Sequence, residues 1–249
     1  MKIKMTKYLG ATLVLFFAML SFANDKYASA AFDFSADQLA SKLMAENVFS
    51  ADGGSAVLYC QSDVSAAGVI ARTNCYDKQG HDALAHTAER ALAELMFTPA
   101  KVNDEAVPVR VSYRVGVSAS EGGNVNIILI PNLGTMQDRY GRDYVAPQER
   151  LDVSGWYDRY SKASWVNGDV FLGDGALSRV AATVNENGKT ELVRTLDDKR
   201  AYKRDAVIVK NAVKKSRFIP GFVDGRAVPM GYLAVVNYGG NSGEAVSAR

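Results

Sequence analysis

Two twelve-residue stretches decide the expected fold: FTPAKVNDEAVP at residues 97–108 and FIPGFVDGRAVP at residues 218–229. The second follows the first at a shift of 121 residues, and six of the twelve positions are identical. The shared positions include two prolines, an aromatic residue and a valine in each stretch: Phe97, Pro99, Val107 and Pro108, then Phe218, Pro220, Val228 and Pro229. A repeat of this length indicates two copies of one domain rather than a short-period solenoid.

Each stretch is preceded by the same order of expected elements. Apolar side chains recur at helical spacing over residues 84–95 and again over residues 202–213, which predicts an amphipathic helix in each copy. A hairpin is expected before each helix. Asn187-Gly188 predicts a two-residue type I′ turn, because both central residues of that turn need positive φ. Ala67-Gly68 holds the equivalent place in the first copy.

The hairpin register predicts a disulfide. With Asn187-Gly188 as the loop, Val180 faces Thr195, and the equivalent pair in the first copy is Cys60 and Cys75. The same loop sets Ala182 opposite Val193 and Val184 opposite Glu191. Opposed residues of an antiparallel pair have Cα atoms about 4.5 or 5.5 Å apart, which suits a disulfide. The alternative is a pair of buried small apolar side chains.

Strands follow the repeated stretches, and together the elements predict an α+β fold. Residues 107–117 alternate between apolar and polar, and residues 125–131 form a further strand. We expect two tandem ββαβ units, each a small antiparallel sheet with one packed helix, plus an N-terminal helix opened by a Ser35/Gln38 capping box. The expected segments are an N-terminal helix at 24–53, units at 54–131 and 173–238, an aromatic-rich ordered connection at 132–172 and a flexible tail at 239–249.

The first 23 residues predict export. Lys2, Lys4 and Lys7 precede an apolar run over residues 8–23, and small residues follow it, which is the order of a secretory signal peptide. Cleavage after Ala23 fits the spacing, while Ala30 ends a second A-x-A site. A retained membrane anchor is the alternative, although the run is short for a spanning helix. The expected compartment is the periplasm.

The second stretch reads F-x-P-x-x-x-x-G-x-x-V-P, with Gly225 at the glycine position, and it resembles the C-terminal domain of the TonB family. The first stretch keeps the other motif residues but is read with Glu105 where the glycine belongs, so its turn is expected to be altered. The resemblance implies a periplasmic module that binds proteins or envelope polymers, with extended peptides added at a sheet edge. Energy transducers of that family have a membrane anchor, a long Pro-rich spacer and one such domain, whereas this sequence has no Pro-rich spacer and two copies of the stretch. A membrane-anchored relative of these transducers is the alternative interpretation.

The composition does not indicate a catalytic function or nucleic-acid binding. The net charge is only +2, so no electrostatic field favours a polyanion as the main partner. His81 and His86 are five residues apart, the wrong interval for two metal ligands on one helical face. We expect no metal, cofactor or catalytic residue. The enzymatic alternative is an envelope hydrolase with a site between the two units, built by residues 132–172.

Two features of the second copy are candidates for binding a partner. Its helix ends in a basic group, Lys210, Lys214, Lys215 and Arg217, which is either a solvated face complementing the helix C-terminus or a site for an anionic partner. Its last strand offers an edge for an extended segment of an envelope protein, with pockets set by Met230, Tyr232 and Val236. That edge could instead pack on the first copy or on a second chain. The membrane is expected as a partner only through an uncleaved leader, and the oligomeric state is left open.

Overall fold

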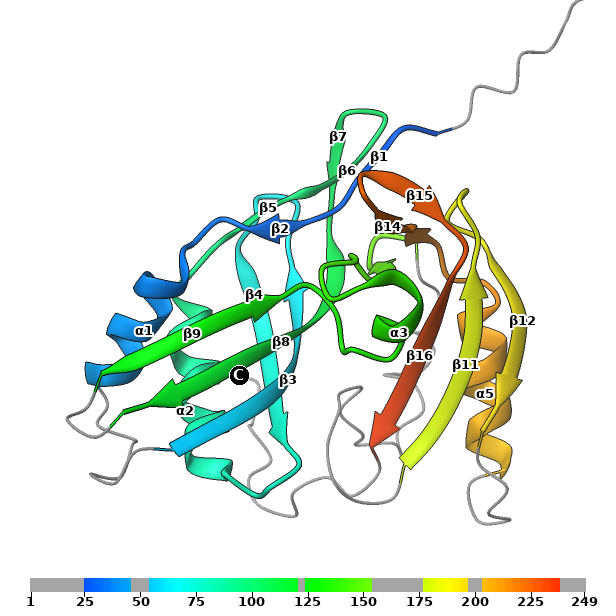
Figure 1. Cartoon of the computed structure of the whole chain (residues 1–249). Coiled ribbons are helices and arrows are strands. Elements are labelled where there is room, and N and C mark those ends of the chain that lie inside the picture. The colour runs from blue at the N-terminus through cyan, green and yellow to red at the C-terminus, as the bar shows by residue number, and fades with distance from the viewer. Residues whose placement is uncertain (1–24, 46–53, 121–123, 154–176, 197–202, 238–249) are drawn as a thin grey trace, which may run out of the picture.

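The computed structural model describes residues 25–45, 54–120, 124–153, 177–196 and 203–237 (Figure 1). The expected signal peptide and tail lie outside these residues, as do residues 154–172 of the expected connection. Within the described segments, no helix is long and apolar enough to cross a membrane.

A six-stranded antiparallel sheet organises the first half of the molecule. Its strands follow the order β13-β10-β8-β3-β4, and β9 also pairs with β8. Their bounds are β3 (Gly54–Val64), β4 (Ile70–Asp77), β8 (Val109–Ala119), β9 (Val125–Ile130), β10 (Gln148–Arg150) and β13 (Phe218–Ile219). Along β8, the apolar positions from Val109 to Val117 are buried while most of their neighbours are half-buried. The burial of the apolar positions is therefore confirmed, but the other face is not the wet face that the alternation predicted, since Arg110 is 1% exposed.

Two helices cover one face of this sheet (Figure 1). Helix α2 (Asp82–Ala93) buries Leu84, Ala88 and Leu92, as its periodicity predicts. Helix α1 (Ala36–Ala45) packs beside β9 and α2. The capping box at its start is confirmed, because the Gln38 amide nitrogen of the backbone donates to Ser35 Oγ (3.2 Å) and the Ser35 N–H donates to Gln38 Oε1 (2.7 Å).

The second half has a three-stranded sheet with one helix behind it. The strand order is β12-β11-β16, with β11 (Leu177–Val184), β12 (Thr190–Thr195) and β16 (Met230–Asn237). Helix α5 (Lys203–Val213) covers one face, where Val180, Ala182 and Ala234 pack against Val209 and the end of the helix.

Short strands join these parts. The N-terminal β1 (Tyr27–Ala28) and β2 (Ala31–Phe32) pair with β6 (Ala100–Val102) and β5 (Phe97–Thr98), and β6 continues into β7 (Glu105–Val107). In the second stretch β14 (Gly221–Val223) pairs with β15 (Arg226–Val228). Helix α3 (Gln137–Tyr140) is a single turn between the halves.

The two repeated stretches form the same hairpin turn. Asn103 (φ 53°) and Asp104 (φ 68°) link β6 to β7, while Asp224 (φ 49°) and Gly225 (φ 73°) link β14 to β15. Both are two-residue loops with two positive φ values, as a type I′ turn requires. The expectation of an altered turn in the first stretch is wrong, because Asp104 takes the glycine's place and Glu105 already belongs to β7. Aspartate and asparagine tolerate the left-handed region.

A second contact is the same in both repeats, and it explains why residues 68 and 188 are glycines. The Phe97 N–H donates to the Gly68 carbonyl (2.9 Å), and the Phe218 N–H donates to the Gly188 carbonyl (3.0 Å). Gly68 has φ 81° and Gly188 has φ 66°. A Cβ on either glycine would lie 2.1 or 2.0 Å from the carbonyl oxygen of its phenylalanine, so no larger residue fits.

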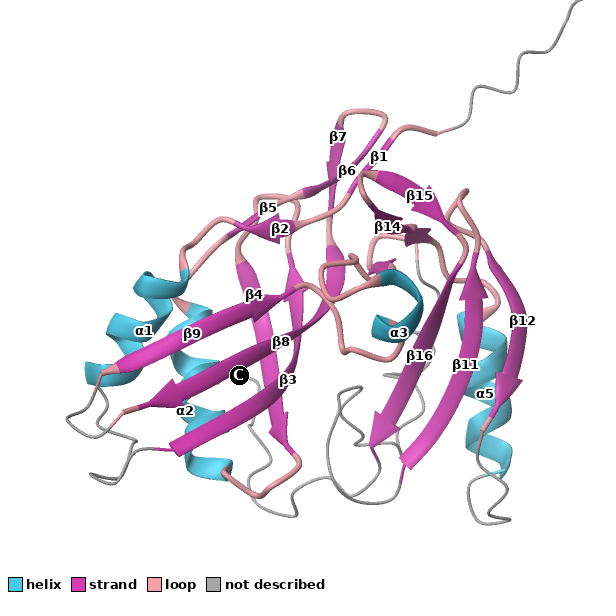
Figure 2. Cartoon of the chain, in the orientation of Figure 1, coloured by secondary structure: helices cyan, strands magenta, loops and turns pink. Residues whose placement is uncertain are grey.

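The predicted fold class, α+β with two tandem ββαβ units, is wrong. The described residues form sixteen strands in five sheets and only four short helices, so the protein is mainly β (Figure 2). The sheets also fail to divide into two units. Strand β10, inside the expected connection, pairs with β8 on one side and with β13 of the second stretch on the other.

The hairpin register is only partly as expected. Cys60 pairs with Cys75 and the two are joined by a disulfide, so that prediction is confirmed. Val180 faces Thr195, but an irregularity then shifts the register, and Thr183 rather than Val184 lies opposite Glu191. The loop before β12 is longer than a type I′ turn. Among its residues only Gly188 has positive φ, and the Gly188 N–H donates to the Asn185 carbonyl (3.0 Å).

Candidate functional site

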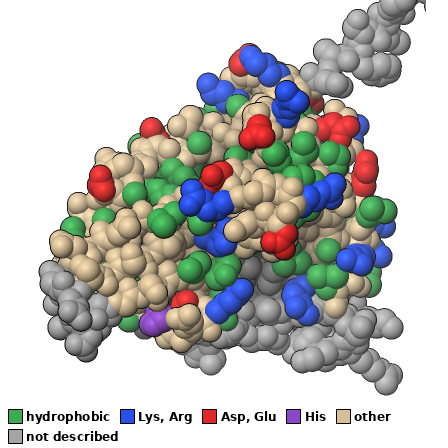
Figure 3. Space-filling view, viewed as in Figure 1, with side chains coloured by type: hydrophobic (Ala, Val, Ile, Leu, Met, Phe, Trp, Pro, Cys, Tyr) green, Lys and Arg blue, Asp and Glu red, His purple; other side chains and the backbone are tan. Residues whose placement is uncertain are grey.

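A groove of about 690 Å³ lies over the face of the second sheet opposite α5. One wall is the segment before α3 and the floor comes from all three strands, with these lining residues: Thr135, Met136, Ala181, Ala182, Thr183, Leu192, Val193, Arg194, Gly231, Tyr232 and Leu233. Arg194 is the only charged residue among them. Hydrophobic and basic side chains lie interspersed over this part of the molecular surface (Figure 3). The volume is in the range of ligand sites, and the floor is open β-sheet.

The inner end of the groove meets the first half. A small space of about 30 Å³ shares Thr135, Gly231 and Leu233 with the groove and is also lined by Ser112 of β8. The groove therefore starts on the second sheet and ends at the junction of the two halves.

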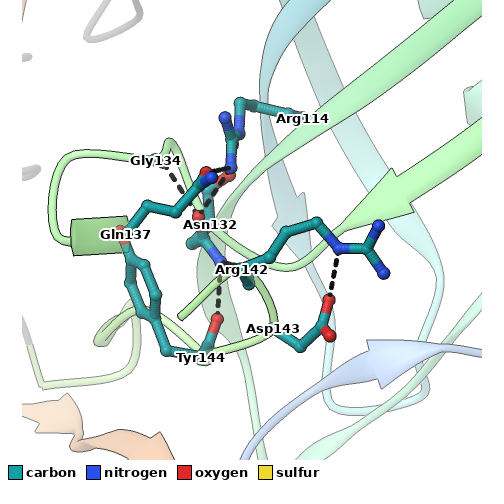
Figure 4. A network of polar contacts seen from close by, with 7 residues as sticks. All are labelled: Arg114, Asn132, Gly134, Gln137, Arg142, Asp143 and Tyr144. Atoms are coloured by element: carbon teal, nitrogen blue, oxygen red, sulfur yellow. Dashed lines mark hydrogen bonds and ion pairs between the residues drawn. The ribbon is translucent and has the colours of Figure 1, made fainter. Parts of the chain in front are cut away.

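Asn132 holds the loop that forms the groove wall (Figure 4). Its buried amide donates to the carbonyls of Arg142 (2.8 Å) and Tyr144 (2.7 Å), and its Oδ1 accepts from the Gly134 N–H (2.8 Å). Arg114 donates to the Asn132 carbonyl (3.1 Å) and to Gln137 Oε1 (3.0 Å). Arg114 thus fixes the loop to β8 at its start, Asn132, and at the first residue of α3, Gln137.

The same loop covers the beginning of the outer edge of β16. The Gly231 N–H donates to Met136 Sδ (3.3 Å), and the Tyr140 hydroxyl donates to the Pro229 carbonyl (3.1 Å). Backbone direction alternates along a strand with period two, so the N–H groups of Leu233 and Val235 also point away from β11. Within the described residues β16 pairs only with β11, and no hydrogen bond donated by these outer N–H groups to another described residue is found.

The other long strand edges of the described sheets are protected. At the β4 edge, Glu89 Oε1 of α2 accepts from the Cys75 N–H (2.7 Å). Helix α1 packs against β9. Strand β12 is interrupted by the register shift, where Leu192 has φ 49°. Irregular strands and covering helices are common means of preventing strand addition, and the outer edge of β16 beyond Gly231 has neither.

A buried polar cluster joins the halves beneath the groove. Glu149 of β10 is fully buried, and its carboxylate accepts from the hydroxyls of Ser216 (2.8 Å) and Tyr232 (3.0 Å). Burial, and then the nearby Glu149 carboxylate, raise the pKa of the Tyr232 hydroxyl well above its usual value, so this hydroxyl remains a donor. Beside it, Arg110 makes two hydrogen bonds to the Asp63 carboxylate (2.8 and 3.0 Å).

The structure places the expected strand pockets differently from the sequence analysis. Met230 is 1% exposed and is not available to a partner. Tyr232 is half-buried, bonds Glu149 through its hydroxyl and also lines the groove. For Val236 the structure describes only the backbone. The side chain that β16 turns into the groove is Leu233.

The basic residues lie together, away from the groove. Lys214, Lys215 and Arg217 are exposed and Lys210 is half-buried, at and after the end of α5. Lys189 of the β11–β12 hairpin is exposed and forms a β-bridge with Arg217. The motif residues serve the fold: Phe97, Phe218 and Val107 are buried, and the prolines flank the short strands.

The two histidines make local contacts with carboxylates. His81 Nδ1 lies 2.6 Å from Asp77 Oδ2, and His86 Nδ1 lies 3.1 Å from Glu89 Oε2. Burial raises the pKa of the Asp77 carboxyl, but hydrogen bonds from the backbone and ring of His81 outweigh it, and the net pKa is lowered. In the described part of the chain, no group of three or more His, Cys, Asp or Glu residues could hold a metal ion.

Sequence reasoning missed Asn132, Glu149 and Arg110. A charged residue in a three-residue strand has no periodicity to reveal its burial, so Glu149 has no signal in a single sequence. Asn132 follows the predicted strand 125–131 and precedes a glycine-containing loop, which is a weak turn signal.

No protein-family model, curated protein or solved structure matches this chain.

Proposed function

We propose that this protein is an exported, non-enzymatic module of the cell envelope that binds an extended segment of another envelope protein by adding it to the outer edge of β16. The observation that carries the proposal is that residues 233–237 of β16 have no strand partner on their outer side among the described residues. They lie beside the groove, whereas the β4 edge is bonded by Glu89 and β12 is irregular. Backbone hydrogen bonds would supply affinity, and the groove would take alternate side chains of the bound segment. The resemblance to TonB C-terminal domains supports the same mode of binding.

The added strand would be short and fixed in position. Met136 and Tyr140 already satisfy the outer groups of Gly231 and Pro229, so a partner would pair from the Gly231 carbonyl onward. Leu233 faces the groove together with Ala181 and Leu192, which favours an apolar side chain at the matching position of the partner.

Replacing Val235 by proline is expected to abolish partner binding while leaving the fold intact. The Val235 N–H points outward, so its loss removes a donor for the added strand without removing a β11–β16 hydrogen bond. The matched control is Val235→Ala, which shortens the same side chain but keeps the N–H. Binding is read in cells from a photo-crosslinking residue at Leu192, which is 81% exposed in the groove, with the crosslinked peptide identified by mass spectrometry.

The proposal expects one segment of one envelope protein to be crosslinked in the parent and in Val235→Ala, and lost in Val235→Pro. Circular dichroism and thermal unfolding establish that the proline variant is folded. If that folded variant keeps its crosslink, while Lys214→Glu with Lys215→Glu loses it, strand addition is wrong and the basic residues are the site.

Export is proposed with cleavage after Ala23. Residues 25–32 are part of the fold, because β1 pairs with β6. The buried Gln148 side chain also accepts a hydrogen bond from the Ala30 N–H (2.8 Å) and donates one to the Ala30 carbonyl (2.9 Å). Cleavage after Ala30 would remove β1 and break that pair.

We therefore expect the exported protein to begin at Asn24, as intact-mass measurement would show. A chain beginning at Ala31, or a full-length chain in the inner membrane, would contradict this expectation. A full-length chain would favour the membrane-anchored alternative.

A further inference from the structure

We infer that the groove selects a partner segment with a large apolar side chain and an acidic side chain two residues away, and that Leu192 recognises the apolar one. The inference rests on the proposed function, because it takes the occupant to be an extended peptide segment. It adds which side chains that segment must carry.

Leu192 belongs to a β-bulge in β12. Between Glu191 and Arg194, both of which pair with β11, strand β12 has one residue more than β11 has. Leu192 lies in this insertion with φ 49°, in the left-handed region. Bulges that need a left-handed residue normally have glycine there, because the Cβ of an L-residue crowds the following carbonyl oxygen. The main chain at Leu192 is therefore strained.

The Leu192 side chain is also held in solvent. It is 81% exposed, more than any other large apolar side chain of the described residues, and it lines the groove. Protection of the β12 edge explains the bulge. It does not explain the leucine, since glycine or asparagine would form the same bulge with less strain and less exposed apolar surface. Backbone strain of this kind is concentrated at ligand-binding sites, so Leu192 indicates an apolar group in the bound ligand.

The rest of the groove leaves room for that group. The floor includes Ala181 and Gly231, which contribute almost no side chain. The wall on the other side includes Met136, whose Sδ lies 3.4 Å from the position of a Cβ on Gly231. Methionine adapts its shape to the side chains that it contacts. A large aliphatic or aromatic side chain of the partner would therefore contact Leu192 on one side and Met136 on the other.

Arg194 indicates the acidic side chain. It is exposed and is the only charged residue that lines the groove, and no ion pair of its side chain with an acidic residue is found within the described residues. Glu191, at the other end of the bulge, accepts a hydrogen bond from the Asn185 amide (2.7 Å). Arg194 pairs with Ala181, which pairs with Leu233 of β16. Charge complementarity favours a carboxylate here, and same-face side chains of a strand are two residues apart.

The stability of Leu192→Asn is the first test. Because asparagine tolerates the left-handed region, we expect a higher urea midpoint than in the parent, with an unfolding equilibrium constant about fivefold smaller. The control is Val57→Asn on β3, where the apolar side chain is 42% exposed and φ is not positive, and this change should not raise the midpoint. A midpoint of Leu192→Asn that is unchanged or lower would overturn the inference.

The second test selects binders from a phage library of random nonapeptides on the immobilised, exported protein. We expect the enriched peptides to share a large apolar residue with Asp or Glu two positions away. The most enriched peptide, synthesised and measured by fluorescence anisotropy, should bind Leu192→Asn at least about tenfold more weakly than the parent, because a buried leucine contact is lost. It should bind Val57→Asn as it binds the parent. Arg194→Gln should weaken the peptide about threefold, but should not weaken the same peptide with its acid changed to the amide.

The variants separate this inference from strand addition. If Val235→Pro binds the peptide as the parent does while Leu192→Asn does not, strand addition is wrong and the groove inference stands. If Val235→Pro loses the peptide while Leu192→Asn and Arg194→Gln keep it, the groove inference is wrong and strand addition stands. Enriched peptides that lack the apolar and acidic pair, or no enrichment at all, would also overturn the inference. So would a dimer in size-exclusion chromatography that Leu192→Asn abolishes, because a second copy would then be the occupant.

Discussion

Replacing Arg110 by alanine is expected to lower the free energy of unfolding by about 3–5 kcal/mol. The Arg110 side chain is 1% exposed and that of Asp63 is 13% exposed, and the two form a bidentate pair (2.8 and 3.0 Å). Removing the guanidinium takes away the cation that pairs with the Asp63 carboxylate and that lies near the buried Glu149 carboxylate. A buried charge that loses its partner keeps its desolvation penalty, which accounts for the size of the effect.

Urea unfolding of the parent and the variant measures this difference. Arg142→Ala is the control, because its pair with Asp143 is exposed (57% and 74%) and should be worth less than about 1 kcal/mol. Arg110→Leu combined with Asp63→Leu should recover most of the loss, since it removes both charges. An Arg110→Ala protein that unfolds within about 1 kcal/mol of the parent would show that the pair is not buried in solution.

Replacing both cysteines by alanine is expected to cost about 2–5 kcal/mol. Cys60 and Cys75 face each other on β3 and β4 with a Cα–Cα distance of 4.1 Å, and both are buried. The bond closes a loop of 15 residues, for which the chain-entropy estimate is about 3 kcal/mol. The loss should appear as a lower urea midpoint, and a reducing agent should produce a similar shift in the parent.

The free-thiol content provides an independent check. Denatured, unreduced protein should take up no alkylating agent, whereas uptake of two equivalents would show that the bond is absent. If the bond is absent, the free energy of unfolding of the double alanine variant should not be lower than that of the parent, which would then carry two free thiols.

The sequence predicted the elements that have their own periodicity. Helix α2, strand β8 and the Cys60–Cys75 register follow from apolar spacing and from a glycine at the turn, which are local signals. Of the residues of β16 expected to set pockets, Met230 is buried against the core, whereas Tyr232 is half-buried and lines the groove. The sequence contains the alternation but does not say which face α5 covers.

The prediction of the fold class was wrong for a different reason. Strands β1, β2, β5, β10 and β13 have two or three residues each, too short for any alternation to be visible. Their conformation is set by the strands they meet, so tertiary context decides it. Glu149 and Gln148 illustrate the limit: both are polar residues in a segment expected to be a connection, and both are buried by partners far away in the chain.

The pairing of β10 with both β8 and β13 has a consequence for how this chain unfolds. A duplicated domain normally leaves two bodies that can be cut apart and that melt one after the other. Here the segment between the repeats became the shared strand, with Glu149 facing Arg110 on one side and Phe218 on the other. Neither repeat can be excised without taking a neighbour from the other. The two repeated parts therefore share one sheet and should gain and lose their structure in one cooperative transition.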